Sequence, residues 1–160
     1  MNNSTATAPF NENFYAVDNL KHGRGLIAKR HLGKGDPIMS FHDARPVEQM
    51  DIYSVQIGRD LHVRHWIVDH LNHSCESNVH FDVERRLIIA SRDIDAGEEL
   101  TFFYPSTEWS MLRPFPCGCG SAHCIHWVAG AHVLDSDVLN RYPLTPHVLD
   151  LLEEEASVDA

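Results

Sequence analysis

Short runs of alternating apolar and polar residues, separated by Gly, Asp and Pro, dominate this sequence from Phe14 onward. Such alternation is typical of strands that bury one face, and no long helical periodicity occurs in about the first hundred residues. We therefore expect a mostly β fold made of several small sheets. The expected strands are Phe14–Val17, Leu26–Lys29, Pro37–Phe41, Ile52–Ile57, Leu61–Arg64, Val79–Val83, Leu87–Ser91 and Glu99–Phe103.

Two pairs of these strands are predicted to form hairpins. Gly58-Arg59-Asp60 lies between alternating residues of the fourth and fifth strands, and Glu84-Arg85 separates the sixth from the seventh. Short polar loops between alternating runs favour antiparallel pairing.

Two stretches, residues 30–38 and 92–100, share one layout. Each has Arg, an apolar residue two positions on, a Gly, an acid and then the apolar start of a strand. Gly35 and Gly97 are therefore expected to adopt positive φ in tight turns.

The C-terminal region has a different pattern, which predicts helices. Ser136 is placed to cap a short helix that runs through Leu139. Thr145 followed by Pro146 predicts the N-cap and first turn of a second helix, with Leu144 as a hydrophobic staple. One apolar face of that helix would contain Val148, Leu151 and Leu152.

The 160 residues suit one domain, and the apolar share of 43% and charged share of 22% are ordinary for globular proteins. No run approaches the roughly 20 apolar residues of a membrane span. Met1–Pro9 lacks the layout of a signal peptide, which predicts a protein that is not secreted but cytoplasmic or nuclear. Oligomeric state cannot be read from the sequence.

The formal net charge is −10, from 23 acidic and 13 basic residues. This excess argues against a dedicated nucleic-acid binder, which needs a basic face. It fits a basic substrate steered by a negative field, and it equally fits a role in solubility alone.

Three of the four cysteines fall within eight residues, as Cys117, Cys119 and Cys124. With no secretion signal, disulfides are disfavoured, and this spacing predicts a structural zinc site with tetrahedral thiolate ligands. The spacing alone leaves the fourth ligand open between Cys75, His123 and His126.

A polar segment, Asn72-His73-Ser74-Cys75-Glu76-Ser77-Asn78, follows apolar residues and leads directly into an expected strand. Its donors and acceptors require partners from a ligand, a metal or the segment itself. On its own it also fits a ligand-free turn rich in Asn and Ser.

Together with Gly97-Glu98-Glu99-Leu100-Thr101-Phe102-Phe103-Tyr104, this segment resembles the motifs of the SET-domain methyltransferases. Gly23-Arg24-Gly25-Leu26 resembles an early turn of that family, and the cysteine cluster resembles its post-SET motif. The motifs occur in the family's order. The resemblance implies a SET-domain β-clip with pseudoknot-like threading, a zinc-binding post-SET segment and C-terminal helices.

The resemblance also implies roles for individual residues. Asn72, His73 and the backbone of Gly23, Arg24 and Gly25 are expected to bind S-adenosylmethionine. Tyr104 is the expected catalytic residue and also borders the cofactor, while Trp127 is expected near the cofactor. Phe102 is expected to shape the substrate channel. Apart from the resemblance, Tyr53 is a candidate aromatic for the same channel, and such a residue also fits a core or surface position. The zinc would be shared by Cys75, Cys117, Cys119 and Cys124.

The implied activity is methyl transfer to a lysine side-chain amine of a basic protein or peptide. Ser77 replaces the family's usual proline, and Asp69-His70 replaces its usual Arg-Phe. Because the central insert is very short, two alternatives remain: methylation of a small-molecule amine, and an inactive interaction module. No membrane or direct nucleic-acid partner is expected.

Composition at the N-terminus, the resemblance and the helical pattern at the C-terminus together divide the chain into four parts. We expect a flexible leader over 1–12, a SET domain over 13–112, a post-SET zinc segment over 113–130 and a helical extension over 131–160.

Overall fold

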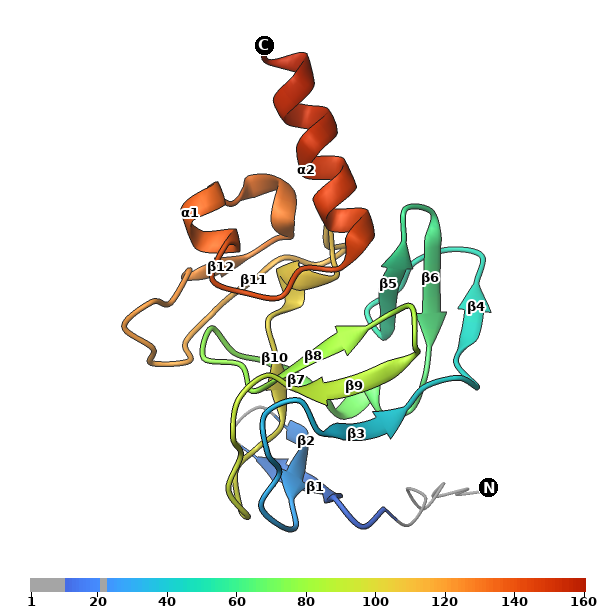
Figure 1. Ribbon diagram of the computed structural model, residues 1–160, viewed down its shortest axis with the longest axis vertical. Helices are drawn as coiled ribbons and strands as arrows, with labels where there is room; N and C mark the ends of the chain where they lie inside the picture. The colour runs from blue at the N-terminus through green and yellow to red at the C-terminus, as the bar shows by residue number, and fades with distance from the viewer. Residues whose placement is uncertain (1–10, 21–22) are drawn as a thin grey trace.

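The computed structural model describes residues 11–20 and 23–160, which fold into five small sheets and a few short helices (Figure 1). Every pairing is antiparallel except that of β7 with β10. This confirms the expected mostly β architecture. The strands are β1 (Phe14–Leu20), β2 (Gly23–Ala28), β3 (Pro37–Ser40), β4 (Arg45–Val47), β5 (Ser54–Gly58), β6 (Leu61–Arg64), β7 (Asn72–His73), β8 (Val79–Asp82), β9 (Leu87–Ala90), β10 (Thr101–Phe102), β11 (Phe115–Pro116) and β12 (Trp127–Val128).

Both predicted hairpins are present, as β5–β6 and β8–β9. The β8–β9 sheet adds β3 at the other edge of β9, and the β5–β6 sheet adds β4 at the other edge of β6. The strand expected over Ile52–Ile57 begins only at Ser54. Asp51 Oδ1 accepts the Tyr53 backbone N–H at 2.8 Å, a local turn that keeps Ile52 and Tyr53 out of the ladder.

The two repeated stretches lie against each other. Leu32 and Ile94 form an isolated antiparallel bridge, with N–H···O distances of 2.9 and 2.8 Å. Gly35 and Gly97 have φ of 89° and 91°, as their place in the repeat predicts. The strand expected over Glu99–Phe103 is shorter, and only Thr101 and Phe102 pair as β10.

The predicted C-terminal helices are α1 (Ser136–Leu139) and α2 (Pro146–Val158), and α2 projects from the sheets toward the C-terminus (Figure 1). Ser136 is the first residue of α1 and not its cap, because Asp135 occupies that position. Thr145 is the N-cap of α2, but its hydroxyl donates to Ser106 O at 3.0 Å and does not cap the helix. No helix among the described residues is long and apolar enough to cross a membrane.

Two apolar cores meet at β10. Phe102 belongs to a core between the sheets, whereas the adjacent Phe103 belongs to a second core with Leu139 and Val148 of the C-terminal helices. Because successive side chains of an extended backbone point to opposite faces, β10 and the residue that follows it join both cores.

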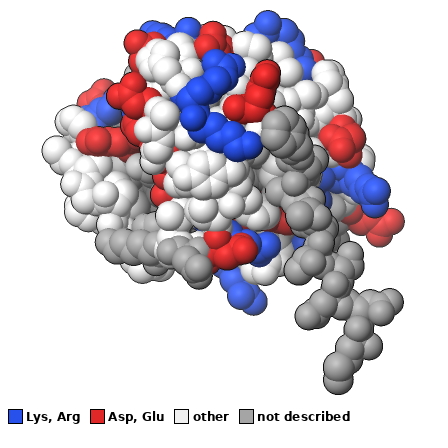
Figure 2. Space-filling view, turned by 90° about the horizontal axis from the view of Figure 1, so that it is seen from below, with Lys and Arg blue, Asp and Glu red and all other residues white. Residues whose placement is uncertain are grey.

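Charged side chains of both signs are interspersed on the face shown in Figure 2. On this face Lys and Arg alternate with Asp and Glu over short distances. The net charge of −10 is therefore not expressed here as a uniformly negative surface.

Asn78 connects the segment after β7 to β10 and is only 2% exposed. Its Nδ2 donates to Glu99 O at 2.8 Å, its Oδ1 accepts the Thr101 N–H at 2.9 Å, and its backbone N–H donates to Thr101 O at 3.0 Å. The side chain thus satisfies two buried backbone groups.

Replacing Asn78 by Ala removes both side-chain hydrogen bonds and leaves their backbone partners unsatisfied. We expect Asn78→Ala to lower the free energy of unfolding by about 2–4 kcal/mol in urea denaturation. Asn140→Ala, at an exposed position, is the control and should change it by no more than about 0.5 kcal/mol. Equal stability of the two variants would contradict this role for Asn78.

Candidate active site

The parallel pairing of β7 and β10 brings the two motif segments together. Asn72 lies opposite Thr101, and His73 lies opposite Phe102. The Ser74 N–H donates to Phe102 O at 3.2 Å, which continues the pairing past β7.

Tyr104 follows β10 and begins a 3-10 helix, η2 (Tyr104–Ser106). Its hydroxyl donates to Leu71 O at 2.8 Å, and its backbone N–H donates to His73 Nδ1 at 3.2 Å. Burial raises the pKa of Tyr104, and the nearby Glu108 and Glu99 carboxylates raise it further. The hydroxyl is therefore protonated and held against a backbone carbonyl.

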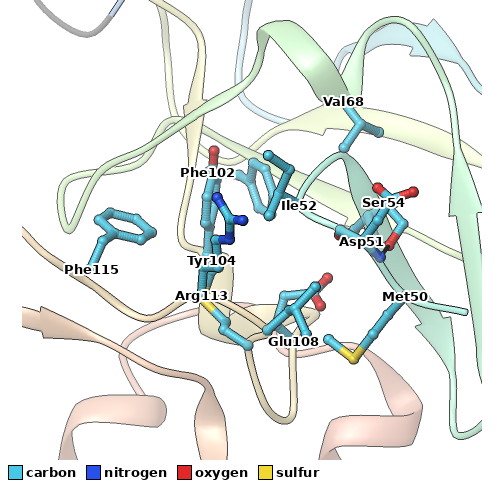
Figure 3. A pocket seen from close by; sticks show the side chains of 13 residues that line it. Met50, Asp51, Ile52, Ser54, Val68, Phe102, Tyr104, Glu108, Arg113 and Phe115 are labelled. Atoms are coloured by element: carbon cyan, nitrogen blue, oxygen red, sulfur yellow. Dashed lines mark hydrogen bonds between the residues drawn. The ribbon is translucent and has the colours of Figure 1, made fainter.

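Tyr104 lines a cavity of about 270 Å³, which we call the Tyr104 cavity (Figure 3). Its charged lining residues are Asp51, Glu108 and Arg113. Its walls are largely apolar, a composition typical of pockets that hold the carbon skeleton of a ligand. The apolar side chains are Met50, Ile52, Val55, Val68, Phe102, Met111, Leu112 and Phe115.

The two residues expected in the substrate channel lie differently. Phe102 lines the Tyr104 cavity, and the ring centroids of Phe102 and Tyr104 are 4.6 Å apart. Tyr53 is not among the lining residues; it is 40% exposed, and the Arg64 guanidinium lies 5.2 Å from its ring centroid. Phe115, which the sequence analysis did not single out, packs edge-on against both Tyr104 and His73.

The segment Gly23–Gly25 lies directly against Asn72. Asn72 Nδ2 donates to Arg24 O at 2.6 Å and to Glu99 Oε1 at 2.8 Å. A Cβ added at Gly25 would overlap the Leu20 side chain and lie 2.9 Å from Glu99 Oε1. Only glycine permits this close approach, so the structure brings three of the expected cofactor-binding positions into contact.

Polar atoms near this segment fit a cationic cofactor. Asp69 Oδ1 is buried with no hydrogen-bond partner among the described residues. Burial raises the pKa of Asp69, although Arg64 and Arg24 oppose this. S-Adenosylmethionine carries a sulfonium and an ammonium group, and a buried acceptor without a partner, such as Asp69 Oδ1, suits a cation of this kind.

Trp127, also expected near the cofactor, lies on β12 with its backbone paired to Pro116. It is 52% exposed and is not among the residues lining the Tyr104 cavity. Its role stays a prediction.

The four cysteines converge although Cys75 is far from the others in sequence. Their sulfur atoms all lie within 4.8 Å of one another, and Cys75 Sγ and Cys117 Sγ are 3.9 Å apart. Tetrahedral zinc with bonds of about 2.3 Å separates its sulfur ligands by about 3.8 Å. The cluster can therefore bind zinc, and the residue that joins Cys117, Cys119 and Cys124 in it is Cys75 and not His123 or His126.

His73 connects this cluster to Tyr104. Because its Nδ1 accepts the Tyr104 N–H, its proton resides on Nε2, which lies 3.5 Å from Cys75 Sγ. Burial lowers the pKa of His73 to about 4, so the ring is neutral near pH 7. One imidazole thus orients both a cysteine of the cluster and the backbone of the tyrosine.

Glu108 is a site residue that the sequence analysis did not identify. It lines the Tyr104 cavity and is 7% exposed, and burial raises its pKa to about 7. A Glu four residues after the expected catalytic tyrosine was the only available signal.

A family model described as "SET domain" matches residues 23–105, slightly more than half of the chain. The chain belongs to the SET-domain family. Its Gly23–Gly25, Asn72–His73 and Tyr104 motifs all lie within the matched region.

Two curated relatives illustrate the range of this SET-domain family. The "Methyltransferase flvH" of Aspergillus flavus is 44% identical over 132 residues, covering 81% of this chain and 72% of the relative. The human "Histone-lysine N-methyltransferase 2B" is 28% identical over 129 residues, covering 64% of this chain but 5% of the relative. The chain thus spans most of the first and a small part of the second.

A solved structure shares the SET-domain fold at low identity. KRYPTONITE in complex with mCHH DNA, H3(1–15) peptide and SAH aligns with a TM-score of 0.55 and 20% identity, over 77% of this chain and 31% of that one.

The cysteine geometry predicts one zinc ion per chain. We expect Cys119→Ser to lose the metal and to lower the melting temperature, because the ion ties residue 75 to residues 117–124. His123→Ala, which removes the nearby imidazole and no cysteine, should keep the zinc. Metal analysis and thermal unfolding of the reduced proteins measure both, and a folded, reduced wild type without zinc would refute the site.

Proposed function

We propose that this chain transfers a methyl group from S-adenosylmethionine to a lysine-type amine, most specifically a lysine side chain of a protein. The observation that carries the proposal is the Tyr104 hydroxyl, which lies against Leu71 O at 2.8 Å and borders a largely apolar cavity. Both residues lie within residues 23–105, the region that the SET-domain model matches.

The residues proposed to hold the cofactor are Gly23, Arg24, Gly25, Asn72 and His73, with Tyr104 and Trp127 at its border. When bound, S-adenosylmethionine supplies a methyl group on a sulfonium, a leaving group that needs no acid or metal at the reacting carbon. The amide N–H groups of Asn72 donate to Arg24 O and to Glu99 Oε1. Asn72 Oδ1 is therefore left as an acceptor for a cationic ligand.

The chain's own task is to position a neutral amine and exclude water. Apolar side chains such as Phe102 and Phe115 surround the acceptor and disfavour its charged form. Tyr104, fixed by Leu71 O and by His73, orients the amine. Positioning of this kind accounts for a large share of the rate gain of two-substrate reactions.

A protein acceptor is supported by the relatives, several of which are named histone-lysine N-methyltransferases. KRYPTONITE was solved with an H3(1–15) peptide. The carboxylates of Asp51 and Glu108 in the Tyr104 cavity suit a basic side chain.

A small-molecule amine is the second proposed acceptor. It is favoured by a relative of which this chain covers 72%, "Methyltransferase flvH", which is named only as a methyltransferase. The β5–β6 hairpin beside the cavity is closed by a tight loop, so no long insert forms a peptide groove there.

Tyr104→Phe removes the hydroxyl and keeps the ring packing against Phe102 and Phe115. We expect turnover to fall by about 10²–10³-fold, because the group that orients the amine is lost. Cofactor affinity measured by calorimetry should be retained. Tyr15→Phe, on the exposed side of β1, is the matched control and should keep wild-type turnover. Wild-type turnover in Tyr104→Phe would refute the assignment of Tyr104.

The acceptor class can be separated with radiolabelled cofactor. We expect label in lysine-rich proteins and peptides, and none in the same substrates after acetylation of their lysines. Label only in free alkyl amines would establish the small-molecule alternative. No transfer to any amine by a cofactor-binding wild type would favour the inactive module.

A further inference from the structure

Glu108 places a carboxyl group inside the Tyr104 cavity. Its backbone N–H donates to Tyr104 O at 3.0 Å, so the two residues are one helical turn apart on a single segment. Both side chains line the cavity, and Figure 3 shows Glu108 projecting into it between Tyr104 and Met50.

Neutral donors hold this carboxyl in place. Glu108 Oε1 accepts the Gln56 backbone N–H at 2.7 Å and lies 3.2 Å from the Thr107 hydroxyl, which donates to it. No Lys or Arg among the described residues forms an ion pair with Glu108. A carboxylate that is 7% exposed therefore has no ion-pair partner in the part of the chain that the structure describes.

The charged and titratable groups around Glu108 do not supply an ion-pair partner for its carboxylate. Asp51 and Arg113 line the same cavity, and Arg113 is exposed. His147 of α2 lies behind the segment and binds Thr107 O at 2.8 Å. Burial raises the pKa of Glu108 to about 7, despite the hydrogen bonds from Gln56 and Thr107. A glutamine would make the same structural contacts without burying an ionisable group.

We propose that Glu108 is a catalytic residue of the proposed amine methylation, on which this inference rests, and that its carboxylate binds the acceptor ammonium and removes one proton from it. An N–H bond of the ammonium breaks, and its electron pair stays on nitrogen as the lone pair that methylation requires. An O–H bond forms at Glu108, and the carboxylic acid later returns the proton to solvent.

This role defines the acceptor class of the cavity. Its apolar walls fit an alkyl chain, and the single uncompensated carboxylate fits a cationic amine at the end of that chain. An acceptor that is an alcohol or a carboxylate has no proton on a positive nitrogen for Glu108 to take.

Glu108→Gln tests the proposal, because the amide keeps an oxygen for Gln56 and cannot take a proton. In the wild type we expect kcat/KM for a lysine peptide or alkyl amine to rise as the pH passes about 7. In Glu108→Gln, kcat/KM should be about 10²-fold lower than in the wild type at pH 8. It should then increase toward pH 10, because only amine molecules already neutral in solution react.

A stability measurement separates catalysis from packing. The pKa of Glu108 is raised above the ordinary value in the fold, so ionisation destabilises the wild type as the pH rises from about 4.5 through 7. We therefore expect the melting temperature of Glu108→Gln to match the wild type at pH 4.5 and to exceed it at pH 8. A purely structural carboxyl predicts a lower melting temperature at both values.

Glu153→Gln, on the exposed part of α2, is the matched control because it removes the same charge. It should leave kcat/KM and its pH profile unchanged. If Glu108→Gln keeps the wild-type rate and profile while Tyr104→Phe is inactive, the role of Glu108 is wrong and the proposed function stands. If the wild type methylates no amine, both are wrong.

Discussion

Parallel pairing of two-residue strands, β7 with β10, positions most of the residues discussed at the site. Antiparallel neighbours need only a tight turn, but these two segments lie about 30 positions apart and require the β8–β9 hairpin between them. Asn78 supplies with its side chain the ladder contacts that such short strands lack. The register of one pair of dipeptides thus determines where Asn72, His73 and Tyr104 lie.

The polar atoms around this pairing are mainly acceptors. Leu71 O, Asp69 and Glu108 all present oxygen, and no Lys or Arg of residues 11–20 and 23–160 forms an ion pair with the Asp69 or Glu108 carboxylate. Burying several acceptors together is unfavourable unless cations complete them. Both proposed reactants, a sulfonium and an alkyl ammonium, have the charge that this arrangement lacks.

Local sequence patterns predicted much of this site. The polar run that contains Asn72, His73 and Cys75, the segment ending at Tyr104 and the cysteine spacing were all visible, and alternation predicted most of the sheets. Tyr53 was harder to place, because a hydrogen bond from its own N–H to Asp51 keeps it out of β5. Glu108 looks like an ordinary surface acid in sequence, and its buried carboxylate accepts a hydrogen bond from Gln56, which is 52 positions away. Long-range contacts of this kind leave no local pattern, and the proposed domain boundaries, such as that between 112 and 113, depend on them as well.

Tyr142 joins the C-terminal segment to the cysteine cluster. Its ring stacks on Phe103 with centroids 3.6 Å apart and an interplanar angle of 5°, and its hydroxyl donates to Cys75 O at 2.8 Å. On the ribosome, the nascent chain exposes residue 75 long before residue 142 leaves the exit tunnel. Cys75 and the aromatic face of Phe103 therefore lack this contact until residue 142 has emerged, so the second core closes after the segments of the first core are available.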